Sequence, residues 1–245
     1  VAWAQHAKVV MRNTVRNSPV PDQQTLVWDL PLRLFHWALA LAFVISWVTA
    51  EAGIEWADAH LYSGYSVLGL VAFRLIWGFV GTYHARFRNF IRGPRALIKS
   101  LTKLPKKTAP TAPGHSAVGG WASILLILLM LGQATSGLFI TDDILFSGPY
   151  NSIVSSALAD TLGSFHHLNF NFLIAAVSMH LCIMLWYALR KSHNLVTPMM
   201  TGYTRCAPNE GVPSSEIIRA LICASVVAGL LGLLIGLAPE PEYFF

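Results

Sequence analysis

Four histidines fall within or at the ends of long apolar segments of the chain: His36, His60, His166 and His180. Ionisable side chains inside a membrane are costly, and they usually face the interior of a helix bundle, where they serve a function. Imidazole is a common ligand of haem iron, and two imidazoles at one depth on facing helices can hold one haem between them. A single membrane histidine would be explained as a packing residue. Four at matched depths predict two haem sites.

Helical spacing selects His166 over its neighbour His167. Fourteen residues separate His166 from His180, and they turn a helix through about 1400°, within roughly 40° of a whole number of turns. The two side chains therefore share one helix face. The thirteen residues from His167 to His180 would leave those two some 140° apart. His166 is the predicted ligand, and His167 is the alternative.

Depth along the helices predicts how the histidines pair. His36 opens the first apolar segment, on the side toward which His180 lies in the fourth. His60 and His166 open the second and fourth segments on the other side. We therefore expect the pairs His36/His180 and His60/His166, separated by about 21 Å along the fourth helix.

Other residues of these segments suit a haem. Arg74 lies fourteen residues after His60, on the same face and near the inner pair, where a guanidinium could bind a haem propionate. Its alternative role is to extend to the inner membrane surface. The small residues Gly64, Ala175 and Ala176 would give a porphyrin room, or would serve ordinary helix packing.

Five apolar segments have the length of about 20 residues that a bilayer requires. The chain is 54% hydrophobic and only 12% charged, so it fits a soluble globular protein, which is normally about a quarter charged, poorly. The expected fold is an all-α integral membrane protein, with a four-helix haem-binding transmembrane bundle and one additional C-terminal transmembrane helix. We place the segments at 33–52, 60–81, 118–140, 166–189 and 215–238.

Basic residues predict the orientation in the membrane. They gather before the first segment, between the second and third, and between the fourth and fifth, whereas the other loops contain acidic residues and no Lys or Arg. Basic loops stay in the cytoplasm, so we expect the N-terminus inside and the C-terminus outside. The net charge of +5 is explained by this asymmetry and needs no nucleic-acid partner.

Three parts of the chain are expected: a cytoplasmic tail at 1–25, a haem-binding domain at 26–202, and a loop with the C-terminal helix at 203–245.

The remaining motifs exclude other chemistry. The three cysteines, Cys182, Cys206 and Cys223, form no CxxC pair, and no CxxCH motif for covalent haem occurs. No P-loop or dinucleotide fingerprint is present. Four further histidines are expected to be solvated residues of tails and loops, although His115 and His193 could line a quinone or propionate site: His6, His84, His115 and His193.

Several stretches of the chain, in this order and spacing, resemble the bacterial cytochrome b561 family, which includes the b-type cytochrome subunits of nickel–iron hydrogenases. They are VWDLPLRLFHW (27–37), FRLIWGFVG (73–81), RFRNFIRGPRALI (86–98), GHSAVGGW (114–121), TSGLF (135–139) and HHLNFNFLIAAVSMH (166–180). The resemblance implies a four-helix core with two non-covalent haems, and its ligand positions correspond to His36, His60, His166 and His180. The family typically has an acidic residue after the third ligand, where this chain has His167.

These observations predict a di-haem b-type cytochrome of the bacterial inner membrane that transfers electrons between the quinone pool and a redox partner. With two protein ligands on each iron, no position is open for oxygen, which favours electron transfer over oxygen activation. One alternative is a cytochrome b subunit that anchors a hydrogenase or another dehydrogenase. The other is a membrane transporter or scaffold without haem. Lipid, a quinone or quinol, and a soluble cytochrome or dehydrogenase subunit are the expected partners.

Overall fold

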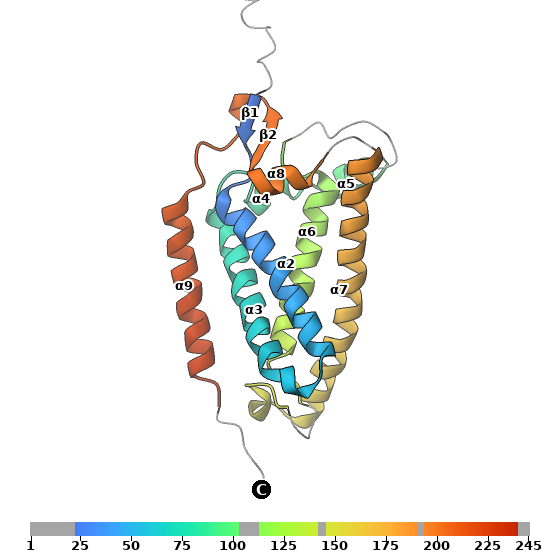
Figure 1. Ribbon diagram of the computed structural model, residues 1–245, viewed down its shortest axis with the longest axis vertical. Coiled ribbons are helices and arrows are strands. Elements are labelled where there is room, and N and C mark those ends of the chain that lie inside the picture. Colours follow the sequence, from blue (N-terminus) through green and yellow to red (C-terminus); the bar gives the residue numbers. More distant parts are fainter. Residues whose placement is uncertain (1–22, 103–112, 142–145, 191–193, 240–245) are drawn as a thin grey trace, which may run out of the picture.

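The computed structural model describes residues 23–102, 113–141, 146–190 and 194–239. In this part of the chain, five helices are long and apolar enough to cross a membrane. Four of them stand side by side as a bundle, and α9 lies at its edge against α3 (Figure 1). This confirms the predicted all-α membrane fold. The five are α2 (Leu30–Glu51), α3 (Ala57–Val80), α6 (Ala117–Ser136), α7 (Ser156–Arg190) and α9 (Ile217–Gly236).

The fourth spanning helix differs most from its predicted bounds. It was expected at 166–189, but α7 begins at Ser156 and runs for 35 residues. His166 therefore lies well inside the helix and does not open it. The first ten residues of α7, SALADTLGSF, include polar side chains such as Asp160 and Thr161, so apolarity alone places the start too late. The tail to residue 22, His6, His193, Asp142 and Asp143 lie outside the described residues.

Asp29 fixes the start of α2 against the end of α3. Its side chain is fully buried and caps α2 by accepting a hydrogen bond from the Leu32 amide at 2.7 Å. It also accepts hydrogen bonds from Trp77 Nε1 at 3.2 Å and from the Thr82 hydroxyl at 2.5 Å. One carboxyl thus replaces a missing intrahelical partner and joins two helices. The end of α2 that carries His36 is held in this way.

Serine hydroxyls join α2 to α3 near the other end. Ser46 donates to the Ser63 hydroxyl at 2.7 Å, and Ser63 donates to the His60 carbonyl at 2.8 Å. Between these two ends the helices pack through apolar side chains, with Val71 and Trp77 completely buried. The positions of His36 on α2 and His60 on α3 are therefore fixed relative to each other.

Asn169 attaches α7 to α6. Its buried amide donates to the Leu129 carbonyl at 2.9 Å and to the Gln133 side chain at 2.7 Å. Hydrogen bonds between helices hold membrane bundles together where lipid offers no partner. The backbone of α7 packs closely along α6 and stays farther from α2 and α3. The side chains of α7 that face α2 and α3 must bridge this wider separation.

A small antiparallel sheet, which was not predicted, covers the end of the bundle at which α2 begins. This end is called the inner end below, and the opposite end is called the outer end. Strand β1 (Gln23–Leu26) pairs with β2 (Tyr203–Cys206). Gly202, at φ +92°, ends the short helix α8 (Val196–Thr201), and its carbonyl accepts from the Val27 and Trp28 amides. Strands of four residues are too short to show an alternation of apolar and polar residues, and the two strands lie far apart in the sequence.

The remaining elements are η1 (Ile54–Trp56), α4 (Phe87–Phe90), α5 (Pro94–Leu101), η2 (Asn151–Ile153) and η3 (Pro208–Glu210).

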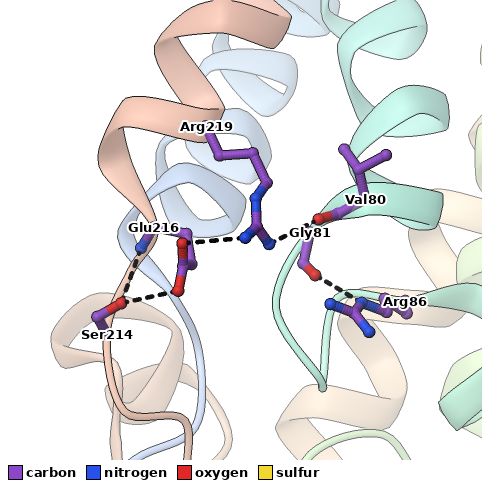
Figure 2. Close-up of polar contacts among 6 residues, drawn as sticks. All are labelled: Val80, Gly81, Arg86, Ser214, Glu216 and Arg219. Atoms are coloured by element: carbon purple, nitrogen blue, oxygen red, sulfur yellow. Dashed lines mark hydrogen bonds and ion pairs between the residues drawn. The ribbon is translucent and has the colours of Figure 1, made fainter.

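Polar contacts at both ends attach α9 to the core. Figure 2 shows Arg219 between Glu216, at 3.4 Å, and the Val80 carbonyl at the end of α3, to which it donates at 3.1 Å. Arg86 donates to the next carbonyl, that of Gly81, at 2.7 Å. Cationic side chains at a helix C-terminus satisfy carbonyls that have no intrahelical partner. At the other end of α9, the Tyr150 hydroxyl donates to the Leu234 carbonyl at 2.5 Å.

Candidate functional site

His36 and His180 face each other at the inner end of the bundle. The centres of their rings are 6.5 Å apart, and the ring planes are tilted by 54°. His36 comes from the first two turns of α2, and His180 comes from α7 ten residues before its end. The two side chains thus meet across the wider gap that separates α7 from α2.

His60 and His166 face each other toward the outer end, again with ring centres 6.5 Å apart. His60 lies in the first turn of α3, and the ring planes are at 74°. His167 is exposed, and its one ring contact among the described residues is with its neighbour His166. The structure therefore brings together the two pairs that depth predicted. The iron-ligand role of these four side chains stays a prediction.

The separation of the rings suits an atom bound from both sides. Two imidazole nitrogens that bind one metal at about 2 Å each place their ring centres a little over 6 Å apart. No group of three or more His, Cys, Asp or Glu side chains forms a metal site in the described part of the chain. Each pair offers two axial ligands, so the other ligands would come from a macrocycle such as porphyrin.

A family model described as prokaryotic cytochrome b561 matches residues 27–202. The matched stretch contains all four paired histidines, Arg74 and the whole four-helix bundle. The chain belongs to the prokaryotic cytochrome b561 family. Members of the family are b-type cytochromes that transfer electrons in membranes, and they typically bind haem b. No curated protein and no solved structure matched the chain significantly.

The cytochrome b561 chain has a buried cation, Arg74, in the last two turns of α3, and this cation and His36 both interact electrostatically with His115. Arg74 is only 2% exposed, and its guanidinium carbon lies 4.7 Å from the centre of the Phe87 ring and 5.8 Å from that of Phe90. Its Nη1 atom is buried and has no hydrogen-bond partner among residues 23–102, 113–141, 146–190 and 194–239. The alternative in which Arg74 extends to the membrane surface is wrong. A buried guanidinium that lacks a partner fits an anionic group such as a haem propionate.

Small residues leave room beside the outer pair. Gly64 lies one turn after His60 on the same face, and a Cβ atom added there would meet nothing within 4 Å. Gly137, at the end of α6, lies so close to His166 that a Cβ would come within 3.2 Å of its ring. The residues present therefore fit haem at two points: open space at Gly64, and a buried guanidinium nitrogen of Arg74 that has no hydrogen-bond partner among the described residues.

Two loop histidines are less exposed than the sequence suggested. His84 is buried, with Nε2 2.7 Å from the Glu210 carbonyl. His115 is half-buried, stacks on Phe90 with ring centres 4.4 Å apart, and meets Trp28 edge-on. The prediction of solvated side chains is wrong because the loops fold over the inner end of the bundle. Burial, and then the nearby charge of Arg74, lower the pKa of His115.

Two residues that contact the outer histidines were not predicted from the sequence. The Ser46 carbonyl lies 2.9 Å from His60 Nδ1, and the Ser136 hydroxyl lies 3.0 Å from His166 Nδ1. Ser136 belongs to the TSGLF stretch that resembles the family. That stretch was the available signal, but it does not reveal which side chain Ser136 contacts.

Proposed function

We propose that the chain is a di-haem cytochrome in which His36 and His180 ligate one haem and His60 and His166 ligate the other. The observation that carries this proposal is the presence of two histidine pairs, each with ring centres 6.5 Å apart. When bound, haem b supplies an iron that gains and loses one electron.

Each protein group has a separate task in this proposal. The helix contacts of Asp29 and Asn169 hold the ligand-bearing helices at the spacing that haem requires. Arg74 would hold a propionate of the inner haem, and its positive charge would raise the potential there. Gly64 would leave room for the outer haem.

We further propose that the N-terminus faces the cytoplasm and that the membrane is the bacterial inner membrane. The described basic residues lie at the end of the bundle that carries β1, β2 and α5, whereas Glu51, Glu55, Asp58 and Asp160 lie at the other end (Figure 1). Basic residues favour the cytoplasmic side. The two haems would then lie at two depths, about 21 Å apart along α7.

The expected partners are a quinone or quinol and a redox protein at the opposite face. Because two histidines bind each iron in this proposal, electrons would pass without substrate binding to the metal. In proteoliposomes, a quinol analogue should reduce the bound haem. Absence of reduction by any quinol, with reduction by a protein donor alone, would contradict the quinone assignment.

Single-ligand variants test the haem assignment. Each of His36→Ala, His180→Ala, His60→Ala and His166→Ala should lower the haem content of the purified chain from two to one, because one axial ligand is lost. His167→Ala is the matched control on the same helix and should keep both haems. Loss of a haem from His167→Ala, with retention in His166→Ala, would overturn the ligand assignment at the outer site.

A further inference from the structure

The outer histidines share a feature that one inner histidine lacks. Nδ1 of His60 and Nδ1 of His166 each lie within hydrogen-bond distance of an oxygen atom. Nδ1 of His36 is buried and has no hydrogen-bond partner within the part of the chain that the structure describes. His36 at the inner site therefore differs from both outer histidines in the contact that its Nδ1 atom makes.

The partner of His60 determines which ring nitrogen carries the proton. The Ser46 carbonyl can only accept, so the proton must be on Nδ1 of His60. Nε2 of a neutral imidazole then has a free lone pair and can bind a metal.

The hydroxyl of Ser136 likewise determines which ring nitrogen of His166 carries the proton. Ser136 is buried, and its hydroxyl donates to the Gly132 carbonyl at 2.7 Å. With its hydrogen engaged there, the oxygen accepts from His166 Nδ1 at 3.0 Å. The Gln133 carbonyl lies close to both Ser136 and His166 and is a second acceptor. Both contacts favour the tautomer of His166 whose Nε2 is free.

We infer that Ser136 is a positioning residue for His166, and that the outer site consequently has the lower midpoint potential of the two. This inference rests on the proposed di-haem function. A hydrogen bond from the far nitrogen orients a ligating histidine and raises its basicity. A more basic ligand stabilises the oxidised iron and lowers the potential. At the inner site, His36 lacks this contact and the Arg74 cation favours the reduced state.

A redox titration of the purified, haem-loaded chain tests the inference. Ser136→Ala removes the hydroxyl, and Ser136→Cys keeps a side chain of similar size that is a weaker acceptor. Thr135→Val is the matched control, because the Thr135 hydroxyl bonds only to carbonyls of its own helix. Measurement in a His36→Ala background, where the outer haem alone is expected, assigns the change to the outer site.

The expected result is a positive shift of the lower of the two midpoint potentials in Ser136→Ala, and a smaller shift in Ser136→Cys. The higher potential should not move, and Thr135→Val should match the wild type. Selective loss of the outer haem from both Ser136 variants would also support the positioning role. Unchanged potentials and haem content in both, or a shift of the higher potential, would overturn the inference. A wild-type chain without two haems would instead overturn the proposed function.

Discussion

At the scale of single residues, the unpaired guanidinium of Arg74 is the least ordinary feature of the bundle. A charge taken out of water is costly unless it gains a partner of opposite sign. Among the described residues, Nη1 of Arg74 has no hydrogen-bond partner, although the rings of Phe87 and Phe90 contact the guanidinium. Cation–π contacts of this kind contribute about 1–2 kcal/mol. The buried carboxyl of Asp29 interacts with Arg74 electrostatically, and a propionate would add an anion that accepts a hydrogen bond from Nη1.

Replacing Arg74 should therefore change the inner site alone. In Arg74→Gln we expect a lower midpoint potential of the inner haem, because a positive charge near the iron favours the reduced state. The measurement is a redox titration, with the exposed Arg95→Gln on α5 as the control. Equal potentials in Arg74→Gln and wild type would contradict the propionate contact.

A bulky side chain at Gly64 should compete with the outer haem. The space that a Cβ would enter at Gly64 is open in the structure. We expect Gly64→Leu to lower haem content from two toward one per chain, because the side chain would occupy the volume of the macrocycle. Gly229→Leu is the control, since a Cβ added there on α9 also meets nothing within 4 Å. Equal haem contents in the two variants would show that Gly64 does not face a haem.

Helical spacing and depth predicted how the four histidines pair, but they could not predict which other residues contact these histidines. Helical period and depth depend on one helix at a time, and they were sufficient to pair His60 with His166. The contact of Ser136 with His166 depends on the rotation of α6 against α7, for which the sequence has no pattern. The burial of His115 depends likewise on how a loop folds back over Phe90.

At the scale of elements, Asp29 contributes most to holding the inner ends of α2 and α3 together. We expect Asp29→Ala to lower the free energy of unfolding by roughly 3 kcal/mol, from a lost N-cap and an unpaired Trp77 indole. Thermal denaturation followed by circular dichroism measures this loss. Asp29→Asn keeps an acceptor for the Leu32 amide and should lose less. An Ala variant as stable as wild type would show that the cap contributes little.

The buried carboxyl of Asp29 also predicts how the difference in stability between wild type and Asp29→Asn depends on pH. Burial raises the pKa of Asp29 above 3.8, although hydrogen bonds from Thr82, Leu32 and Trp77 oppose the shift. A raised pKa in the folded state means that this contribution to stability is present at low pH and is lost as pH rises through the folded pKa. The melting temperature of wild type minus that of Asp29→Asn should therefore fall as pH increases. A difference that grows with pH would contradict a raised pKa.

The spanning helices could be predicted because lipid requires long apolar segments, and four of the five lie within a few residues of the expected bounds. The start of α7 could not, because its first ten residues are too polar to be recognised by apolarity. The pairing of β1 with β2 was missed for a different reason. It joins segments 177 or more residues apart, and neither QQTL nor YTRC has an alternating pattern.

At the scale of the whole molecule, α2, α3, α6 and α7 carry the candidate sites and α9 carries none of the paired residues. Ala220 and Cys223 of α9 pack on Leu32 and Trp77, near the inner end. The two histidine pairs thus lie one above the other inside a single bundle, joined by α7. An arrangement of this kind suits the passage of electrons from one side of a membrane to the other.

The most direct test is a reduced-minus-oxidised absorption spectrum of the purified full chain, combined with haem quantitation per polypeptide. A di-haem cytochrome should give a b-type spectrum and two haems per chain. One haem per chain would show that one histidine pair does not bind haem, and the absence of a b-type spectrum would contradict the proposed haem binding altogether.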